Sequence, residues 1–250
     1  MENGKIIGLG IHIYNEDVYP LKSFEINLRN CDLIGELDIS DCTDMVFLDL
    51  YHNRITSVKS KNMPSMRIFG VQDNLLESID VSEMPSCQGI DAGMNKLKEI
   101  DFSHNPELVE LYINDNEFSE IDLSHNPMLK TLYLRGTNTA LADLRRNLNF
   151  QRLLALDCPL QAIVVSPDHA LENIDVMVEE GVQLYVLDTL AALPNVKTLP
   201  PTIFTIPKSG GRNSTQVVMT FKQAEDVGID ITALREEYQP AFDIILYEIT

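Results

Sequence analysis

The sequence predicts an α/β solenoid: a right-handed stack of about eight units with a parallel sheet on its concave side and a small α+β cap at its C-terminal end. Three observations predict it. Apolar residues recur with a 21-residue period, apolar and polar residues alternate within each recurring segment, and the period fails after Leu187. The 250 residues divide into an N-terminal strand or cap at 1–22, the solenoid at 23–190 and the C-terminal cap at 191–250.

The first segment, Met1–Tyr14, carries one lysine before an apolar run that Gly8 and Gly10 interrupt. It has no small-residue cleavage site, so we expect a strand there and no signal peptide. If Met1 is the native start and no export signal was removed, the sequence predicts a cytoplasmic protein. No apolar run approaches the roughly 18 residues that a membrane-spanning helix needs.

The repeat is clearest in three consecutive units that begin at Met66, Cys87 and Leu108, with apolar residues at positions 1, 4, 6, 11 and 14 and asparagine at position 9. Less regular units extend it upstream to Ile26 and downstream to Val186. The alternating x-L-x-L-x part predicts a strand with one buried face. One unit cannot bury that face alone, so the units stack and their strands pair in parallel.

The ninth position holds Asn53, Asn74, Asn95 and Asn116, and the amide is expected to satisfy backbone groups of the adjoining turns. Cysteines take the same position in two other units, and a third cysteine takes a leucine position. We therefore expect three buried thiols that behave as small apolar side chains, a fourth in a turn, and no structural disulfide. Cys31 and Cys158 take the ninth position, Cys87 takes the leucine position, and Cys42 lies in the turn.

This pattern, L-x-x-L-x-L-x-x-N/C-x-L, resembles the leucine-rich repeat family over about two thirds of the chain. The 21-residue unit, with I-D-L-S-x-N-P-x-L over Ile121–Leu129, is similar to the short repeats of bacterial surface and secreted leucine-rich proteins. The resemblance implies a leucine-rich repeat horseshoe and an extracellular or cell-surface location. It leaves the function open, because one fold serves many functions.

Two further columns punctuate each unit where the chain turns. Proline recurs at one position, where it fixes φ, and aspartate recurs beside a buried apolar residue. The carboxylates are expected to accept local backbone N–H groups; calcium is the alternative, although no glycine-rich aspartate loop accompanies them. Because the repeat unit is short, the convex side is expected to hold turns and short 3₁₀ or extended segments. The columns are Pro64, Pro85, Pro106, Pro127 and Asp38, Asp80, Asp101, Asp122, Asp143.

Candidate catalytic and metal-binding residues are few. His104 and His125 share a column one strand spacing apart, but with no clear third ligand they are interpreted as turn residues. Asp91 and Glu110 fall in adjacent units on the concave face and form the one candidate pair for a glycan hydrolase. An open sheet offers no deep pocket, so the sequence predicts no enzyme, no cofactor and no metal.

The concave face carries two predicted ligand-binding patches of large apolar side chains. Exposed aromatic groups on a rigid surface favour protein recognition, although high β propensity alone also places aromatics in sheets. Two arginines beside the second patch favour an acidic ligand, and Asn173, Asp175 and Met177 are expected to complete the face in the last unit. The first patch is Phe47, Tyr51, Ile68; the second is Tyr112, Tyr133, Leu154, Leu156, with Arg135 and Arg152.

A net charge of −19 and a pI near 4.5 argue against nucleic acid and anionic membranes as partners. The sequence therefore predicts a monomeric, non-enzymatic module that binds an unknown protein or peptide. The alternative is a structural or self-assembling subunit whose ends or acidic convex face make the contacts.

The C-terminal tail departs from the repeat. Strands are expected near Thr202–Ile206 and Gln216–Met219, and a final strand over Phe242–Ile249. A capping pattern that begins at Thr220 predicts one short helix, and a second is expected at Thr232–Tyr238. Because an open solenoid end exposes core, we interpret this tail as a cap.

Overall fold

The structure is a computed structural model that describes residues 24–166, 168–169, 175–179, 182–186, 204–206 and 215–218. Within these residues all regular elements are strands, and no helix there is long and apolar enough to cross a membrane. The strands are β1 Phe24–Asn27, β2 Ile34–Asp38, β3 Met45–Asp49, β4 Arg54–Lys59, β5 Ile68–Gly70, β6 Gly89–Asp91, β7 Glu110–Tyr112, β8 Thr131–Tyr133, β9 Leu141–Asp143, β10 Arg152–Ala155, β11 Ala162–Val165, β12 Asp175–Val178, β13 Gln183–Val186, β14 Phe204–Ile206 and β15 Thr215–Val218.

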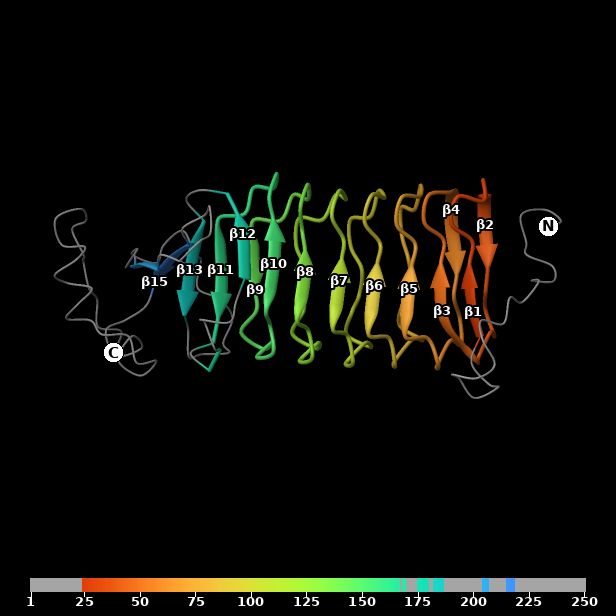
Figure 1. The fold of residues 1–250 in the computed structure, drawn as a ribbon, viewed down its shortest axis with the longest axis horizontal. Coiled ribbons are helices and arrows are strands. Elements are labelled where there is room, and N and C mark those ends of the chain that lie inside the picture. Colours follow the sequence, from red (N-terminus) through yellow and green to blue (C-terminus); the bar gives the residue numbers. More distant parts are fainter. Residues whose placement is uncertain are drawn as a thin grey trace.

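Eight of these strands form one parallel sheet, in the order β1-β3-β5-β6-β7-β8-β10-β12. They lie side by side along the long axis and point the same way (Figure 1). One strand comes from each repeat unit, and seven turns of the chain join the eight strands. The predicted solenoid with a parallel sheet is confirmed.

The register follows the 21-residue period from β3 to β10. At the N-terminal end Ile26 pairs with Leu48, an offset of 22 residues, and the departure is larger at the C-terminal end. Leu132 pairs with Leu153, as the period requires, but Arg152 pairs with Asp175 and Leu154 with Met177. The offset there exceeds the period, because two extra residues enter the last connection. The predicted register of this unit was therefore wrong by two positions: Asp175 and Met177 each move back one column, and Asn173 lies outside the described residues.

The opposite side of the solenoid also carries strands, of which only β14 and β15 were predicted from the sequence. β2 pairs with β4 in parallel, and β9, β11, β13 and β15 form a parallel set to which β14 adds antiparallel. In the middle units the described residues on this side form turns and bends but no strands, which agrees with the predicted turns. The difference follows composition: β11 is Ala-Ile-Val-Val and fully buried, whereas the middle segments mix one isoleucine with glutamate, serine and aspartate.

β14 and β15 confirm the strands predicted near Thr202–Ile206 and Gln216–Met219. The predicted N-terminal strand, the two short helices, and the strand Phe242–Ile249 lie outside the described residues. The division into terminal caps stays a prediction.

Between the two sides runs one continuous core, built from the leucine positions of every unit. Three phenylalanines, Phe69, Phe102 and Phe118, are its largest fully buried side chains. Each core side chain packs against its counterparts in the units before and after it, so stability in a solenoid is a sum over neighbouring units.

The turns between units use the predicted proline and aspartate columns. Proline is the second residue of a β-turn, which Leu108 N closes on Asn105 O at 3.1 Å in one unit. Aspartate accepts the backbone N–H two residues later: Ser124 N donates to Asp122 Oδ1 at 2.9 Å. The same bond recurs at Asp38, Asp80, Asp101 and Asp143, as predicted.

These hydrogen bonds shift the acid titration of the protein. Bonds from the serine side chain and backbone lower the pKa of Asp80, and the corresponding bonds from Ser124 lower the pKa of Asp122. A carboxyl with a lowered folded-state pKa adds stability above its unfolded pKa of about 4 and loses it as pH falls through the folded value. The urea midpoint of the chain should therefore fall as pH drops from about 4.5 to about 3.

The double variant Asp80→Asn/Asp122→Asn checks this. The amide oxygen still accepts the N–H but does not titrate, so the acid-induced fall in urea midpoint should be smaller than in the wild type. An equal fall in both proteins contradicts the assignment to these two carboxyls.

A second set of buried amides lines this turn side of the solenoid. Asn126 Nδ2 donates to Phe102 O at 3.0 Å and to Asn105 O at 2.9 Å, and Asn105 and Asn147 repeat the pattern. His169 takes the same position in the following unit, where Nε2 lies 2.8 Å from Asn147 O. The three Oδ1 atoms are buried without a hydrogen-bond partner among the described residues.

Candidate functional site

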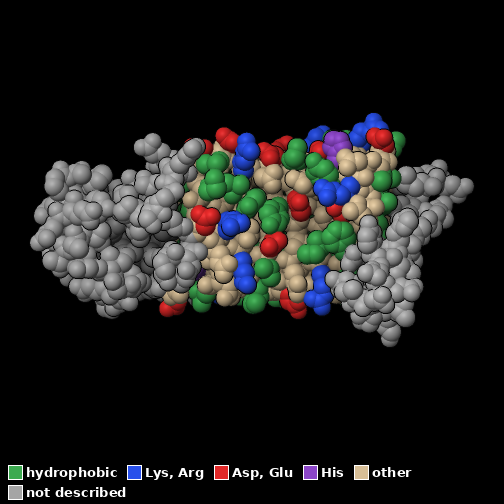
Figure 2. Space-filling view, viewed as in Figure 1, with side chains coloured by type: hydrophobic (Ala, Val, Ile, Leu, Met, Phe, Trp, Pro, Cys, Tyr) green, Lys and Arg blue, Asp and Glu red, His purple; other side chains and the backbone are tan. Residues whose placement is uncertain are grey.

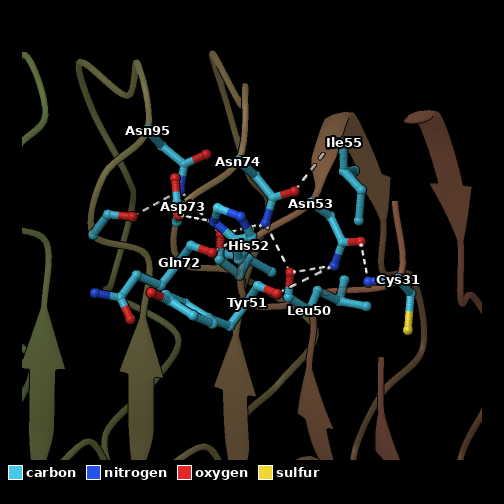
Figure 3. A network of polar contacts seen from close by, with 12 residues as sticks. Cys31, Leu50, Tyr51, His52, Asn53, Ile55, Gln72, Asp73, Asn74 and Asn95 are labelled. Carbon is cyan, nitrogen blue, oxygen red and sulfur yellow. Dashed lines mark hydrogen bonds and ion pairs between the residues drawn. The ribbon is translucent and has the colours of Figure 1, made fainter. Parts of the chain in front are cut away.

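An asparagine ladder fixes the ends of the sheet strands and so positions the face of the sheet (Figure 3). Asn74 Nδ2 donates to Leu50 O at 3.0 Å and to Val71 O at 3.1 Å, while its Oδ1 accepts Ile55 N at 3.0 Å. Each amide therefore joins its own unit to the preceding one. The predicted role of this position is confirmed, and it recurs at Asn53, Asn95 and Asn116.

Other residue types at the ladder position make fewer bonds. Thr137 Oγ1 donates to Leu134 O at 2.8 Å, and Cys158 Sγ lies 3.3 Å from Ala155 O. Both side chains reach the backbone carbonyl three residues earlier, which is a contact that the asparagine amide also makes. The ladder thus continues towards the C-terminal end with weaker donors.

The four cysteines are free thiols. Cys87 is fully buried, as predicted, and burial raises its pKa to about 12. The prediction of a buried thiol was wrong for Cys31, which is exposed. Cys158 is half-buried.

The residue before each ladder position has a left-handed backbone, which turns the chain away from the sheet. Its φ lies between +53° and +68° in seven consecutive units, although glycine occurs in only one of them. The column contains three aspartates, which is a sequence signal for this turn that the sequence-based prediction did not use. The column is Asn30, His52, Asp73, Met94, Asp115, Gly136, Asp157.

Met94→Gly should raise the free energy of unfolding by about 0.5–1 kcal/mol. Glycine avoids the cost of a left-handed backbone, about 1–2 kcal/mol, but the greater conformational entropy of glycine in the unfolded chain cancels part of that gain. The thioether is 44% exposed, so little packing is lost. Met94→Ala keeps the penalty and should not stabilise. Urea denaturation of both variants checks this, and stabilisation by alanine would contradict it.

The face itself, called the sheet face below, consists of the outward side chains of the eight-stranded sheet. From the side of Figure 1, hydrophobic side chains lie among acidic and basic ones, without a large region of one charge (Figure 2). The second predicted patch lies on the strands β7, β8 and β10, and the first on β3 and β5.

The second patch forms a continuous row, called the tyrosine row below: Tyr112, Tyr133, Leu154 and Met177. The four residues are direct neighbours on β7, β8, β10 and β12. The two tyrosine rings meet edge to face, with centroids 4.7 Å apart. Met177 is 48% exposed and extends the row by one strand, while Leu156 lies two residues beyond Leu154.

Tyr112 is held in place by its surroundings. Its hydroxyl donates to Glu110 Oε2 at 3.3 Å. Burial, with the neighbouring Glu110 carboxylate, raises the pKa of Tyr112 to about 12. The phenol is therefore a neutral, oriented group at neutral pH.

The first predicted patch is divided. Phe47 and Ile68 are direct neighbours on β3 and β5, but Tyr51 lies four residues farther along the chain, about 13 Å away. Tyr51 instead packs under the Arg29 guanidinium, 4.7 Å from the ring centroid, and Arg29 Nε lies 3.3 Å from Asp49 Oδ2. The patch is therefore an apolar pair and a separate cation–π cluster.

The glycines between the patches do not form a hollow, because neighbouring side chains lie over them. A Cβ on Gly89 would be 2.9 Å from Ile68 Cδ1, and one on Gly93 would be 2.7 Å from Asn114 Oδ1. Because these two positions are glycines, the side chains of Ile68 and Asn114 can lie directly against the backbone of the neighbouring strand.

Arg135 and Arg152 are both in ion pairs within the chain. Arg135 Nε lies 2.9 Å from Asp157 Oδ2, and Arg152 Nε lies 3.7 Å from Asp175 Oδ2. The expectation of an acidic ligand therefore loses its basis, since the arginine charges are locally balanced. The sequence could not show this, because the partner of Arg152 follows the two-residue insertion.

The candidate hydrolase pair lies in adjacent columns of β6 and β7. Asp91 accepts Gly93 N at 3.4 Å, and burial raises the pKa of Asp91, while Glu110 accepts the Tyr112 hydroxyl. A cavity of about 140 Å³ lies elsewhere, between the Asp122 and Asp143 turns on the other side. Asp91 and Glu110 therefore each accept a hydrogen bond from the sheet itself, and neither lines that cavity.

His104 and His125 each bond to the preceding serine, at 3.0 and 3.1 Å. Among the residues that the structure describes, no group of three or more His, Cys, Asp or Glu side chains is arranged to hold a metal ion.

Comparison with known proteins supports the fold alone. No family model and no curated protein sequence matches the chain. Among solved structures, the functional domain of InlJ from Listeria monocytogenes, which includes a cysteine ladder, is similar with a TM-score of 0.55 and 19% identity over 64% of this chain and 40% of that one. YopM from Yersinia enterocolitica gives a TM-score of 0.48 and 21% identity over 66% and 39%.

The chain spans about two fifths of the length of these two proteins. Similarity to InlJ, the parallel solenoid and the asparagine ladder together show that the chain has a leucine-rich repeat fold.

Proposed function

We propose that this leucine-rich repeat solenoid is a non-enzymatic module that binds a protein or peptide on its sheet face. The observation that carries the proposal is the tyrosine row. Four large apolar side chains form a line across four strands, where they are half-buried or exposed. Isolated exposed apolar residues are ordinary, but a continuous row on a rigid surface is typical of recognition sites.

The row is held rigid by what lies beneath it. The leucine positions between the row residues are fully buried, and Asn116 ties β7 to the unit before it. Rigid aromatic side chains lose little conformational entropy on binding, so their contact area contributes efficiently to affinity.

A photo-crosslinking amino acid at position 133 tests the proposal directly. Expressed in its native host, the full chain should crosslink to a partner from position 133 and not from position 75, because Leu75 is 40% exposed but lies outside the sheet face. Mass spectrometry then identifies the partner. A crosslinked homodimer would favour the self-assembling alternative.

With the purified partner, the variant Tyr112→Ala/Tyr133→Ala/Leu154→Ala should bind about 100-fold or more weakly, since truncating each central anchor costs about 1–2 kcal/mol. A matched control removes three exposed apolar side chains elsewhere and should bind like the wild type. Equal loss in both variants, or full affinity in the first, contradicts the proposal. The control is Leu75→Ala/Met128→Ala/Leu148→Ala.

We also propose an extracellular or cell-surface location. It is supported by the resemblance of the 21-residue unit to the repeats of bacterial surface and secreted leucine-rich proteins.

A further inference from the structure

The tyrosine row has a spacing that selects the shape of its ligand. Successive residues of the row stand on adjacent strands, about 4.8 Å apart, so the row is about 14 Å long and contains three gaps between neighbouring side chains. Side chains at i, i+4 and i+7 of an α-helix lie in one stripe with about 5.4 Å per turn, which fits three such gaps. An extended segment places same-side residues about 6.8 Å apart and falls out of step after one gap.

The backbone beneath the row also disfavours an extended ligand. β7, β8 and β10 are interior strands, each paired on both sides. The three row positions on these strands therefore offer no sheet edge to which a ligand could add a strand, and contacts there must come from side chains; only Met177 stands on β12, the last strand of the described sheet.

The width of the face agrees with a helix lying across the strands. The columns on either side of the row stand four residues apart along each strand, about 13 Å. A helix is about 10–12 Å wide with its side chains, so residues flanking its apolar stripe would lie over these two columns.

The flanks of the row are negatively charged. The two flanks carry five carboxylates and two guanidinium groups, a difference of −3, and Asp91 on β6 adds a sixth carboxylate at the end of the row, beside Tyr112. Both arginines are already paired, to Asp157 and Asp175. The remaining three carboxylates of the flanks have no cation within ion-pair distance among the described residues; they are Glu110, Asp115 and Glu179.

We propose that the ligand of the tyrosine row is an amphipathic α-helix with a narrow apolar stripe and lysine or arginine on both flanks. This rests on the proposed sheet-face function and adds the ligand's shape and charge. The helix lies along the solenoid axis, inserts its stripe between the row side chains and places its cations over these three carboxylates.

Four synthetic peptides of equal length test shape and charge separately against the full chain. The first is helical, with leucine at i, i+4 and i+7 and lysine flanks. The second has glutamate flanks, the third has a central proline that prevents the helix, and the fourth has the first composition in an alternating, extended pattern. Affinities are measured by fluorescence anisotropy at low and high salt.

The first peptide should bind about ten-fold or more tightly than each of the others. Against the glutamate-flanked peptide the difference comes from three exposed ion pairs, and against the other two it comes from loss of the helix. High salt should weaken the binding of the first peptide. The charge-reversed protein Glu110→Lys/Glu179→Lys should prefer the glutamate-flanked peptide. Both side chains are exposed, and an unchanged melting temperature confirms that the variant is folded.

Equal binding of the lysine and glutamate peptides, tighter binding of the extended peptide, or binding of none of the four overturns this inference. Such results leave the crosslinking at position 133 unaffected. A partner crosslinked there through an extended or acidic segment would refute the ligand class while supporting the sheet-face function.

Discussion

Replacing Asn116 by alanine should lower the free energy of unfolding by about 3–5 kcal/mol, among the largest effects of any single polar substitution in the chain. Its Oδ1 accepts Leu97 N at 2.9 Å, and its Nδ2 donates to Ala92 O at 2.9 Å and Ile113 O at 3.1 Å. Alanine leaves these buried backbone groups without partners, and each such group costs about 1–3 kcal/mol.

Two other asparagines serve as internal comparisons. Asn126 is also buried, and slightly more completely, but its side chain uses only the amide nitrogen, since its Oδ1 has no partner among the described residues. Asn126→Ala should therefore cost less, about 2 kcal/mol. Asn138 is exposed, and its substitution should be nearly neutral. Urea denaturation followed by circular dichroism ranks the three variants by their loss of stability. If Asn126→Ala costs as much as Asn116→Ala, the number of side-chain hydrogen bonds does not determine the loss.

Replacing Phe118 by alanine should have a comparable effect, about 3–5 kcal/mol, through a different cause. The ring is 1% exposed and occupies the position that Leu97 holds one unit earlier and Thr139 one unit later. Truncation removes its apolar burial and leaves a cavity that neighbouring units, fixed by their own ladders, fill only in part.

Phe118→Leu should recover most of the loss, because it retains most of the volume. Leu148→Ala removes a side chain that is 49% exposed and should cost less than about 1 kcal/mol. Hydrogen exchange adds a spatial readout: amides of the adjoining units should lose protection, while those around β3 should not. Uniform loss along the chain would indicate that the solenoid unfolds as one unit.

Much of the fold could be predicted because one physical constraint repeats. A 21-residue unit with alternating leucines has to stack, and Asn74 or Asp122 makes the same bond in each copy. The tyrosine row was predictable for the same reason, since Tyr112 and Tyr133 are separated by one repeat period.

The remainder depended on departures from the period or on side-chain conformations. The two extra residues before β12 changed the partner of Arg152 and brought Met177 into the row, and no counting rule locates such an insertion. Tyr51, four residues beyond Phe47, packs against Arg29 instead of joining Phe47 and Ile68, and this side-chain contact was not predicted.

The asparagine ladder makes each unit an interchangeable increment of length. A unit gained or lost between β5 and β7 would keep every neighbouring bond of the same type, while moving the Arg29–Tyr51 cluster and the tyrosine row apart or together by about 4.8 Å. The distance between the Arg29–Tyr51 cluster and the tyrosine row therefore changes by one strand spacing for each unit added or removed. Duplication or deletion of one repeat unit can match their separation to a ligand in discrete steps, without redesigning either contact surface.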